Sequence, residues 1–301
     1  MPTANHPCVN VLVFGAGAMG SLIGGLLSSR HDVTLVGRRG HIDAIKRNGL
    51  KITGRTETVA RLHATTELPS ENQDLILVAT KAYDTALAVG ALERFWHTSL
   101  FLTLQNGLRN ADVLAKKVDR VAAGTTSHGV TFVRDGWIHH AGLGDTYVGP
   151  FAGVSSTDVR KICGELTACG FPATYSDDIR RNLWMKVIVN AAVNPITATA
   201  RVENGRLLEI PQLRSLMERS CMEAAAVARA EGHRLSDGEA IAVTERVAHR
   251  TAKNRSSMLQ DIERGKRTEI SEISGAIVEA GRNHGIAMPV LDTIRLVVGM
   301  L

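Results

Sequence analysis

Three polar residues spaced four apart in an apolar segment are the strongest candidates for chemistry in this chain. Lys186, Asn190 and Asn194 stand at i, i+4 and i+8, so on an α-helix they would form one polar stripe. The residues around them, between 183 and 193, are mostly apolar, which predicts a helix that is buried on most sides. Polar groups in such a helix need partners, and burial would bring the pKa of a lysine towards neutrality and suit it to proton donation. A purely structural polar network is the alternative interpretation.

Serine and acidic residues further along the chain extend this set of candidates. Ser257 and Asp261 would share one face of a helix that Gly265 is expected to end. Glu269 would lie near the start of the next helix, where a carboxylate has an ordinary role in stabilising the helix dipole. The residues alone therefore leave both a catalytic and a structural role open for Glu269.

A glycine-rich turn near the N-terminus has the spacing of a dinucleotide-binding loop. The segment that matches G-x-G-x-x-G, between a predicted strand and a predicted helix, is Gly15-Ala16-Gly17-Ala18-Met19-Gly20. Gly15 would permit the tight turn, Gly17 would let the backbone approach a pyrophosphate, and Gly20 would let the helix pack close to the strand. The N–H groups and the positive dipole at the helix start would bind the phosphates. A glycine turn without a ligand is the alternative.

The end of the next predicted strand favours NADP over NAD. NAD enzymes usually carry an acidic residue there to hold the ribose 2′-OH, whereas this chain has Arg38 and Arg39. Guanidinium groups can pair with a 2′-phosphate through charge-assisted hydrogen bonds. Both arginines could instead be solvated surface charges. We predict NADP(H) as the cofactor, with Arg38 on its 2′-phosphate.

Two more polar residues follow strands that are predicted to end at Ala79 and Leu104. Ligands of open α/β sheets bind at the carboxyl ends of the strands, so Lys81 and Asn106 are expected to face the nicotinamide half of the cofactor. The alternatives are a surface lysine after a strand and a turn asparagine before Gly107.

Strand and helix patterns alternate through the first half of the chain, which is typical of a parallel sheet with helices on both faces. Apolar, β-branched runs predict buried strands at residues 9–14, 32–36, 74–79, 100–104 and 118–123. Residues 131–150 alternate between polar and apolar types and are expected to add antiparallel strands to the edge of this sheet. A helix at 155–168 and a short strand at 172–175 would complete the domain.

The chain after residue 178 has an almost entirely helical pattern. Helices are predicted at residues 181–193, 213–231, 240–252, 268–284 and 289–300. The first should stop before Pro195, because the residue before a proline disfavours the helical conformation. The predicted fold class is therefore α/β, with a Rossmann-type NADP-binding domain over residues 1–177 and an all-α substrate and catalytic domain over residues 178–301, the substrate lying in a cleft between them.

The composition is that of a globular protein: 301 residues, 44% hydrophobic and 22% charged, with a formal net charge of +5. The chain has no long run of lysine and arginine and only 4% aromatic residues, which argues against nucleic-acid binding. A basic site for anionic ligands explains the charge.

Cysteines and the N-terminus bear on location. No Cys-x-x-Cys pair or histidine cluster accompanies the four cysteines, so free thiols in a reducing compartment are expected and no metal site is predicted. Residues 1–7 lack the positive region of a secretory signal, and the apolar stretch 11–27 is too short and glycine-rich for a membrane span. We expect a cytoplasmic protein.

These residues together resemble the ketopantoate reductase (2-dehydropantoate 2-reductase) family over nearly the whole chain. The segments that carry the resemblance are residues 15–20, Thr80-Lys81-Ala82, Gln105-Asn106-Gly107, residues 186–195, residues 257–270 and residues 285–289. The resemblance implies an oxidoreductase that reduces ketopantoate to pantoate with NADPH, in the biosynthesis of pantothenate and coenzyme A.

The resemblance also implies a role for each candidate residue. The residue matching Lys186 is the general acid, and the one matching Glu269 binds substrate and assists turnover. Residues matching Lys81 and Asn106 lie by the nicotinamide and the reacting carbonyl, so Asn106 would contact both cofactor and substrate. The other substrate contacts would be Asn190, Asn194 and Ser257, and Arg38 would hold the 2′-phosphate.

Two segments, 271–275 and 124–128, depart from the form expected most often in the family, which leaves the identity of the keto acid open. One alternative is a related NADP-dependent reductase or dehydrogenase of another 2-keto or 3-hydroxy acid. Another is a non-catalytic NADP-binding regulator, against which Lys186 and Glu269 argue because a sensor needs no proton donor. A small keto acid is the expected partner, and the helical domain could supply the face of a homodimer.

Overall fold

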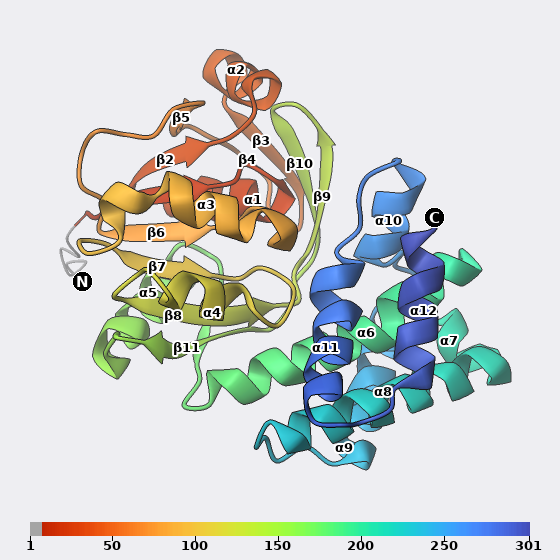
Figure 1. The fold of residues 1–301 in the computed structure, drawn as a ribbon. Coiled ribbons are helices and arrows are strands. Elements are labelled where there is room, and N and C mark those ends of the chain that lie inside the picture. The colour runs from red at the N-terminus through yellow and green to blue at the C-terminus, as the bar shows by residue number, and fades with distance from the viewer. Residues whose placement is uncertain (1–7) are drawn as a thin grey trace, which may run out of the picture. The chain divides into compact units, whose positions relative to one another are not determined.

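The computed structural model describes residues 8–301, which form two compact units (Figure 1). The first unit runs to Gln105 and continues from Asn110 to Ile179. The second consists of Asn106–Arg109 and Arg180–Leu301. The four-residue stretch after Gln105 therefore belongs with the helical unit and not with its neighbours in the chain.

An eight-stranded sheet forms the centre of the first unit. Its strands, in spatial order, are β12 (Thr174–Tyr175), β11 (Thr146–Ala152), β8 (Val121–Thr126), β7 (Leu100–Thr103), β6 (Leu75–Val78), β1 (Asn10–Phe14), β2 (Asp32–Val36) and β5 (His63–Thr65). Every neighbouring pair is parallel except β11 with β8. Val11, Leu12 and Val13 of β1 are fully buried, as expected for a parallel strand covered on both faces. The predicted α/β class is confirmed.

Helices cover this sheet on both faces. They are α1 (Ala18–Leu27), α2 (Arg39–Asn48), α3 (Thr85–Ala91), α4 (Asn110–Ala115) and α5 (Ser156–Ala168). The chain moves along the sheet in one direction from β1 to β2 and in the other from β6 to β7, so right-handed crossovers put α1 and α3 on opposite faces. In Figure 1, α3 and α4 lie on the side of the sheet that faces the viewer.

A second sheet of four strands packs against α1, which was not predicted. Its order is β4 (Thr58–Ala60), β3 (Leu50–Gly54), β10 (Trp137–Gly142) and β9 (Gly129–Arg134). The prediction that all of residues 131–150 extend the main sheet is therefore wrong, because only β11 does so. The alternation in β9 and β10 arises from one face packed on α1, with Ile52 and Ile138 buried beneath it.

Two buried histidines belong to this region: His140 lies on β10, and His128 directly precedes β9. The stacked rings of His128 and His140 have centroids 5.2 Å apart, and Nδ1 of His128 lies 3.0 Å from Nε2 of His140. Nδ1 of His140 is in turn 3.0 Å from Oγ1 of Thr56. Burial lowers the pKa of both rings, and the neighbouring His140 helps to lower the pKa of His128 to about 4.

We expect this pair to make the stability of the chain sensitive to acid. His128 has a pKa of about 4 in the folded chain against 6.5 as its ordinary value, so the unfolded state takes up the proton first. The contribution of His128 to the free energy of unfolding is therefore complete above pH 6.5 and is lost as the pH falls towards 4. The free energy of unfolding should decrease by about 2 kcal/mol between pH 7 and pH 5. Urea unfolding at a series of pH values measures it.

His128→Phe is the matched variant, because it keeps a ring against Phe171, whose centroid lies 4.4 Å from that of His128, and removes the titrating group. Its unfolding free energy should fall less steeply below pH 6.5 than that of the unaltered chain. An identical slope in both would contradict this assignment.

Helices make up the second unit. They are α6 (Ile179–Ala200), α7 (Arg206–Glu209), α8 (Pro211–Ala230), α9 (Asp237–Arg250), α10 (Ser257–Glu263), α11 (Ala276–Asn283) and α12 (Pro289–Gly299). A single π-helical turn, Ser271–Gly275, leads into α11. Residues of α6 lie in the middle of the apolar core, where Val187, Ile188 and Ala191 are almost entirely buried.

The first of these helices does not stop before Pro195, as the sequence predicted. Pro195 lies inside α6 and cannot donate a hydrogen bond to the carbonyl of Ala191. The helix continues because Ile196 and Ala198 are buried in the core, and the hydroxyl of Thr197 lies 2.9 Å from the carbonyl oxygen of Val193. Burial of the following turn thus outweighs the local cost of the proline.

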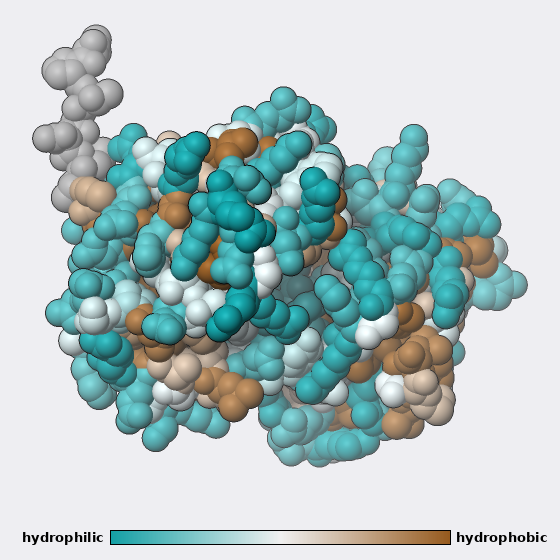
Figure 2. Space-filling view, turned by 90° about the horizontal axis from the view of Figure 1, so that it is seen from above, coloured by the Kyte–Doolittle hydropathy of each residue, from teal (hydrophilic) through white to brown (hydrophobic). Residues whose placement is uncertain are grey.

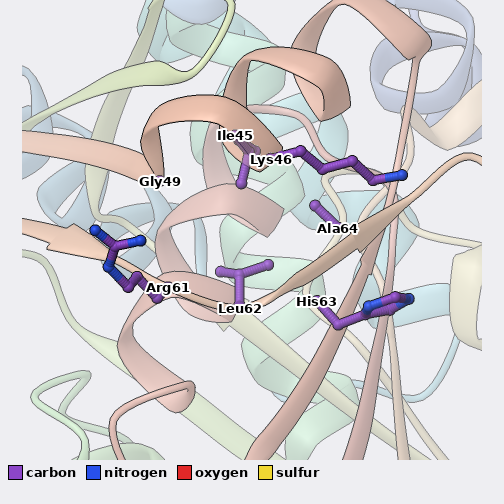
Figure 3. A pocket seen from close by; sticks show the side chains of 7 residues that line it. All are labelled: Ile45, Lys46, Gly49, Arg61, Leu62, His63 and Ala64. Atoms are coloured by element: carbon purple, nitrogen blue, oxygen red, sulfur yellow. The ribbon is translucent and has the colours of Figure 1, made fainter.

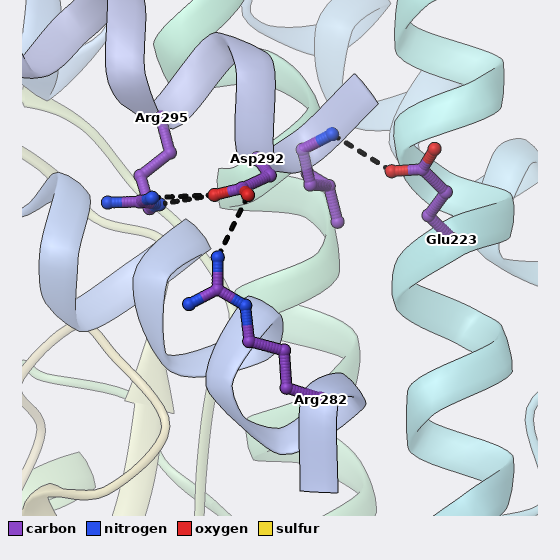
Figure 4. A network of polar contacts seen from close by, with 5 residues as sticks. Glu223, Arg282, Asp292 and Arg295 are labelled. Atoms are coloured by element: carbon purple, nitrogen blue, oxygen red, sulfur yellow. Dashed lines mark hydrogen bonds and ion pairs between the residues drawn. The ribbon is translucent and has the colours of Figure 1, made fainter. Parts of the chain in front are cut away.

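Polar contacts join three helices of this unit (Figure 4). The carboxylate of Glu223 on α8 accepts hydrogen bonds of 2.9 Å from the backbone N–H groups of Val290 and Leu291, at the start of α12. Asp292 on α12 accepts from Arg282 on α11 at 2.9 Å and from Arg295 on its own helix. These contacts satisfy donors at the N-terminus of α12 and fix its direction.

The face of the molecule in Figure 2 is mostly hydrophilic, with small separate groups of hydrophobic residues. The most exposed large apolar side chains include Leu296 and Met300, both on or just after α12. Within residues 8–301, no helix combines the length and apolar character that crossing a membrane requires.

Candidate active site

The predicted polar stripe forms on α6. Asn190 and Asn194 are buried, and Lys186 is half-buried one turn before them. Burial lowers the pKa of the Lys186 ammonium to about 8, and the positive charge of Arg250 on α9 contributes to the same shift. A lysine with this pKa is protonated at neutral pH and can still give up its proton readily.

An amide–carboxylate cluster includes the middle of this stripe. Nδ2 of Asn106 donates to Oε2 of Glu269 at 3.4 Å, and Nδ2 of Asn190 donates to Oδ1 of Asn106 at 3.4 Å. Glu269 is 6% exposed and precedes the helical turn that begins at Ile270. The structure therefore brings together three of the predicted residues through one side-chain amide. The long distances leave these groups able to turn towards a ligand.

The end of the stripe meets the start of α10. Nδ2 of Asn194 lies 3.5 Å from Oγ of Ser257, the first residue of that helix. Asn194 is buried whereas Ser257 is exposed, so this pair combines a fixed amide with an accessible hydroxyl. Gly265 follows the end of α10 with φ +61°, as the sequence predicted for a helix end.

The three glycines of the loop after β1 differ in whether the fold itself requires glycine at their positions. Gly15 has φ +116°, and a Cβ there would lie 2.6 Å from backbone atoms of Ala79 and Thr80. A Cβ on Gly20 would lie 2.1 Å from the carbonyl oxygen of Gly15. At Gly17, the N-cap of α1, a Cβ would meet only the carbonyl oxygen of Ala79, at 4.0 Å.

This difference tests whether the loop fits a dinucleotide. The folded chain itself requires glycine at positions 15 and 20 but leaves open space over Gly17. That is the position where a pyrophosphate would approach the backbone, in front of the first turn of α1 with Ala18 and Met19. The loop therefore has the shape that a dinucleotide pyrophosphate needs.

Arg38 and Lys81 both precede the first turn of a helix at the carboxyl ends of their strands. Arg38 is the N-cap of α2 and is exposed, and Lys81 is the N-cap of the 3-10 turn Ala82–Asp84 and is half-buried. Sequence reasoning gave no role to Gln105, whose Nε2 donates to the carbonyl oxygen of Thr80 at 2.9 Å. Gln105 thus holds the Lys81 loop, and its signals in the sequence were its position beside Asn106 and its place in the segment Gln105-Asn106-Gly107.

A groove of about 210 Å³ lies elsewhere in the first unit (Figure 3). Its lining residues are Ile45, Lys46, Gly49, Arg61, Leu62, His63 and Ala64. They come from the C-terminal end of α2 and the beginning of β5, whereas the glycine loop and Arg38 adjoin the opposite end of α2. None of the predicted site residues lines this groove.

Comparisons with known proteins agree over both units. Residues 11–153 match the family described as ketopantoate reductase PanE/ApbA, and residues 178–300 match ketopantoate reductase PanE/ApbA C terminal. A 2-dehydropantoate 2-reductase of Halobacterium salinarum is 39% identical, covering 95% of this chain and 96% of that protein. The crystal structure of a PanE/ApbA family ketopantoate reductase from Ralstonia eutropha JMP134 is 32% identical with a TM-score of 0.88, covering 96% and 97% of the two chains.

A further structural relative has a different name. A ternary structure of D-mandelate dehydrogenase with NADH and anilino(oxo)acetate matches with a TM-score of 0.91 and 27% identity. The match covers 96% of this chain and 97% of the other. This relative was therefore solved with a nicotinamide dinucleotide, NADH, bound.

Proposed function

The chain belongs to the ketopantoate reductase family, and on this premise we propose that it reduces the keto group of 2-dehydropantoate to give pantoate, with NADPH as reductant. The reaction would serve the biosynthesis of pantothenate and coenzyme A. The observation that carries the proposal is the stripe of Lys186, Asn190 and Asn194 on α6, with the lowered pKa of Lys186 at its start. Residues 1–177 would bind NADP, and residues 178–301, together with Asn106, would bind the keto acid.

NADPH supplies the hydride when bound, and the residues of this chain supply the proton and the geometry. Lys186 carries a proton below its pKa of about 8 and would donate it to the keto oxygen as negative charge develops there. The amides of Asn106 and Asn190, already joined at 3.4 Å, would orient the reacting carbonyl.

The remaining residues would hold the two ends of the substrate. Asn194 and Ser257 offer an amide and a hydroxyl side by side, which suits them to a polar end of the keto acid. Glu269, which accepts a hydrogen bond of 3.4 Å from the Asn106 amide, would also accept one from the substrate hydroxyl. Ketopantoate has both features, a carboxylate at one end and a hydroxyl at the other.

The deciding experiment is the oxidation of NADPH followed by absorbance with ketopantoate. The 2-keto acid that corresponds to mandelate runs alongside, because the likeness to D-mandelate dehydrogenase favours it as the second candidate. Turnover of ketopantoate that is much faster than turnover of the other acid supports the proposal. Faster turnover of the other acid would make that acid the substrate in place of ketopantoate. Binding of NADPH without turnover of any keto acid would instead support a non-catalytic NADP-binding regulator.

Arg38 is expected to carry the preference for NADPH. Arg38→Ala should raise the KM for NADPH by about 10-fold or more, because a charge-assisted contact to the 2′-phosphate is lost, and should leave the KM for NADH nearly unchanged. Steady-state kinetics with both cofactors measure this. Arg47→Ala is the control, since Arg47 is an exposed arginine in the last turn of the same helix. Equal losses for both cofactors would remove Arg38 from the site.

The four cysteines, Cys8, Cys163, Cys169 and Cys221, are free thiols. This supports a cytoplasmic location, where thiols stay reduced.

A further inference from the structure

A buried pair of hydroxyl groups joins α6 to the start of α10. Oγ1 of Thr197 lies 2.8 Å from Oγ of Ser256, and both side chains are buried. Thr197 is three residues beyond Asn194 on α6, and Ser256 immediately precedes Ser257. The pair therefore lies next to both members of the Asn194–Ser257 contact and takes no part in the proposed chemistry.

One arrangement satisfies three of the four hydrogen-bond contacts of this pair. Oγ1 of Thr197 also lies 2.9 Å from the carbonyl oxygen of Val193 and 3.1 Å from that of Asn194, and it has a single proton to give. If Thr197 donates to Val193, its oxygen accepts the proton of Ser256. Oγ of Ser256 can then still accept the N–H of Leu259, which lies at 3.2 Å.

This last contact makes Ser256 the N-cap of α10. The backbone of Ser256 is extended, with φ −59° and ψ 156°, and its carbonyl accepts the N–H of Gln260 at 3.0 Å. Ser256 thus caps α10, and its hydrogen bond to Thr197 holds that cap against α6. These contacts therefore also hold Ser257, the next residue, opposite Asn194.

We propose that Thr197 and Ser256 are positioning residues for keto-acid binding, which hold the Ser257 hydroxyl at the Asn194 amide. The proposal rests on the proposed function, in which those two groups hold one end of the substrate. Without the Thr197 hydroxyl, α10 keeps its cap and its apolar packing but loses its buried hydrogen bond to α6. Ser257 can then move relative to Asn194. This movement lowers the affinity for the keto acid and leaves the proton donor, Lys186, unchanged.

The test compares two substitutions at one position. Thr197→Val has nearly the same shape and lacks the hydroxyl, and Thr197→Ser keeps the hydroxyl. We expect Thr197→Val to raise the KM for ketopantoate about 10-fold, with kcat changed less than threefold and the dissociation constant of NADPH unchanged. Thr197→Ser should restore the KM to within about twofold of the unaltered chain.

Thr244→Val is the matched control. Thr244 is another fully buried helical threonine of this unit, and its hydroxyl donates to the carbonyl oxygen of Ala240 at 2.8 Å. Thr244→Val should lose about as much unfolding free energy in urea as Thr197→Val, and its KM for ketopantoate should be unchanged. If Thr197→Val does not fold, Ser256→Ala against Ser256→Thr provides the same comparison of a lost and a retained hydroxyl.

The outcomes separate this inference from the function on which it rests. If the unaltered chain reduces no keto acid, both are overturned. If it reduces ketopantoate and Thr197→Val keeps its KM, or if Thr197→Ser is as impaired as Thr197→Val, only the positioning role is overturned. A raised KM with rescue by serine and an unaffected Thr244→Val establishes it.

Discussion

Replacing Lys186 by alanine is expected to lower kcat for ketopantoate reduction by about 100-fold or more. The keto oxygen gains negative charge as it accepts hydride, and Lys186 is the half-buried ammonium group of the α6 stripe. Removal of this proton donor leaves the charge to be neutralised by water. Steady-state kinetics at neutral pH measure the loss, and the dissociation constant of NADPH, which should change little, shows that the variant is intact.

The pH dependence of the reaction gives a second signature of Lys186. A general acid works only when protonated, so a pKa of about 8 predicts that the rate falls about tenfold for each pH unit above that value. Lys186→Met, which keeps most of the side-chain volume, should lose this alkaline limb together with most of its activity. Near-normal turnover in either variant, or an unchanged alkaline limb, would exclude Lys186 as the donor.

The second large effect is expected at Gly17. Gly17→Ala should weaken NADPH binding on the order of 100-fold, about 2.7 kcal/mol, because the new methyl group would occupy the space that the pyrophosphate needs. The folded chain accepts this methyl group, since the nearest atom would be 4.0 Å away. Fluorescence titration with NADPH measures the affinity, and thermal unfolding without cofactor should be nearly unchanged.

Gly20→Ala is the informative contrast, because its Cβ would meet the Gly15 carbonyl oxygen at 2.1 Å. That variant should be destabilised even without cofactor. If Gly17→Ala were as unstable as Gly20→Ala, Gly17 would be a structural glycine and the argument for a pyrophosphate at this position would fail.

The parts of the fold that could be predicted from sequence are those whose signals are local. The strand, glycine turn and helix at residues 10–27 follow from apolar runs and glycine spacing, and the structure confirms them. The stripe on α6 follows from a spacing of four residues within one helix. Such patterns need no knowledge of what lies across the fold.

The missed features depend on contacts between distant segments. β10 pairs with β3 in parallel, and an alternating pattern shows that one face is buried without showing which strand is the neighbour. The continuation of α6 through Pro195 depends on packing of Ile196 and Ala198 in the core, which a local rule about proline does not include. The Thr197–Ser256 pair is likewise invisible until both helices are in place.

The short stretch Asn106–Arg109 limits how the helical unit could be transferred between proteins. The helical unit looks like a segment that gene fusion or recombination could move as one piece, because Arg180–Leu301 is continuous. A transplanted piece of that kind would leave behind the one side-chain amide that contacts both Glu269 and Asn190. Transfer of Arg180–Leu301 alone would therefore separate the Glu269 carboxylate from the Asn106 amide.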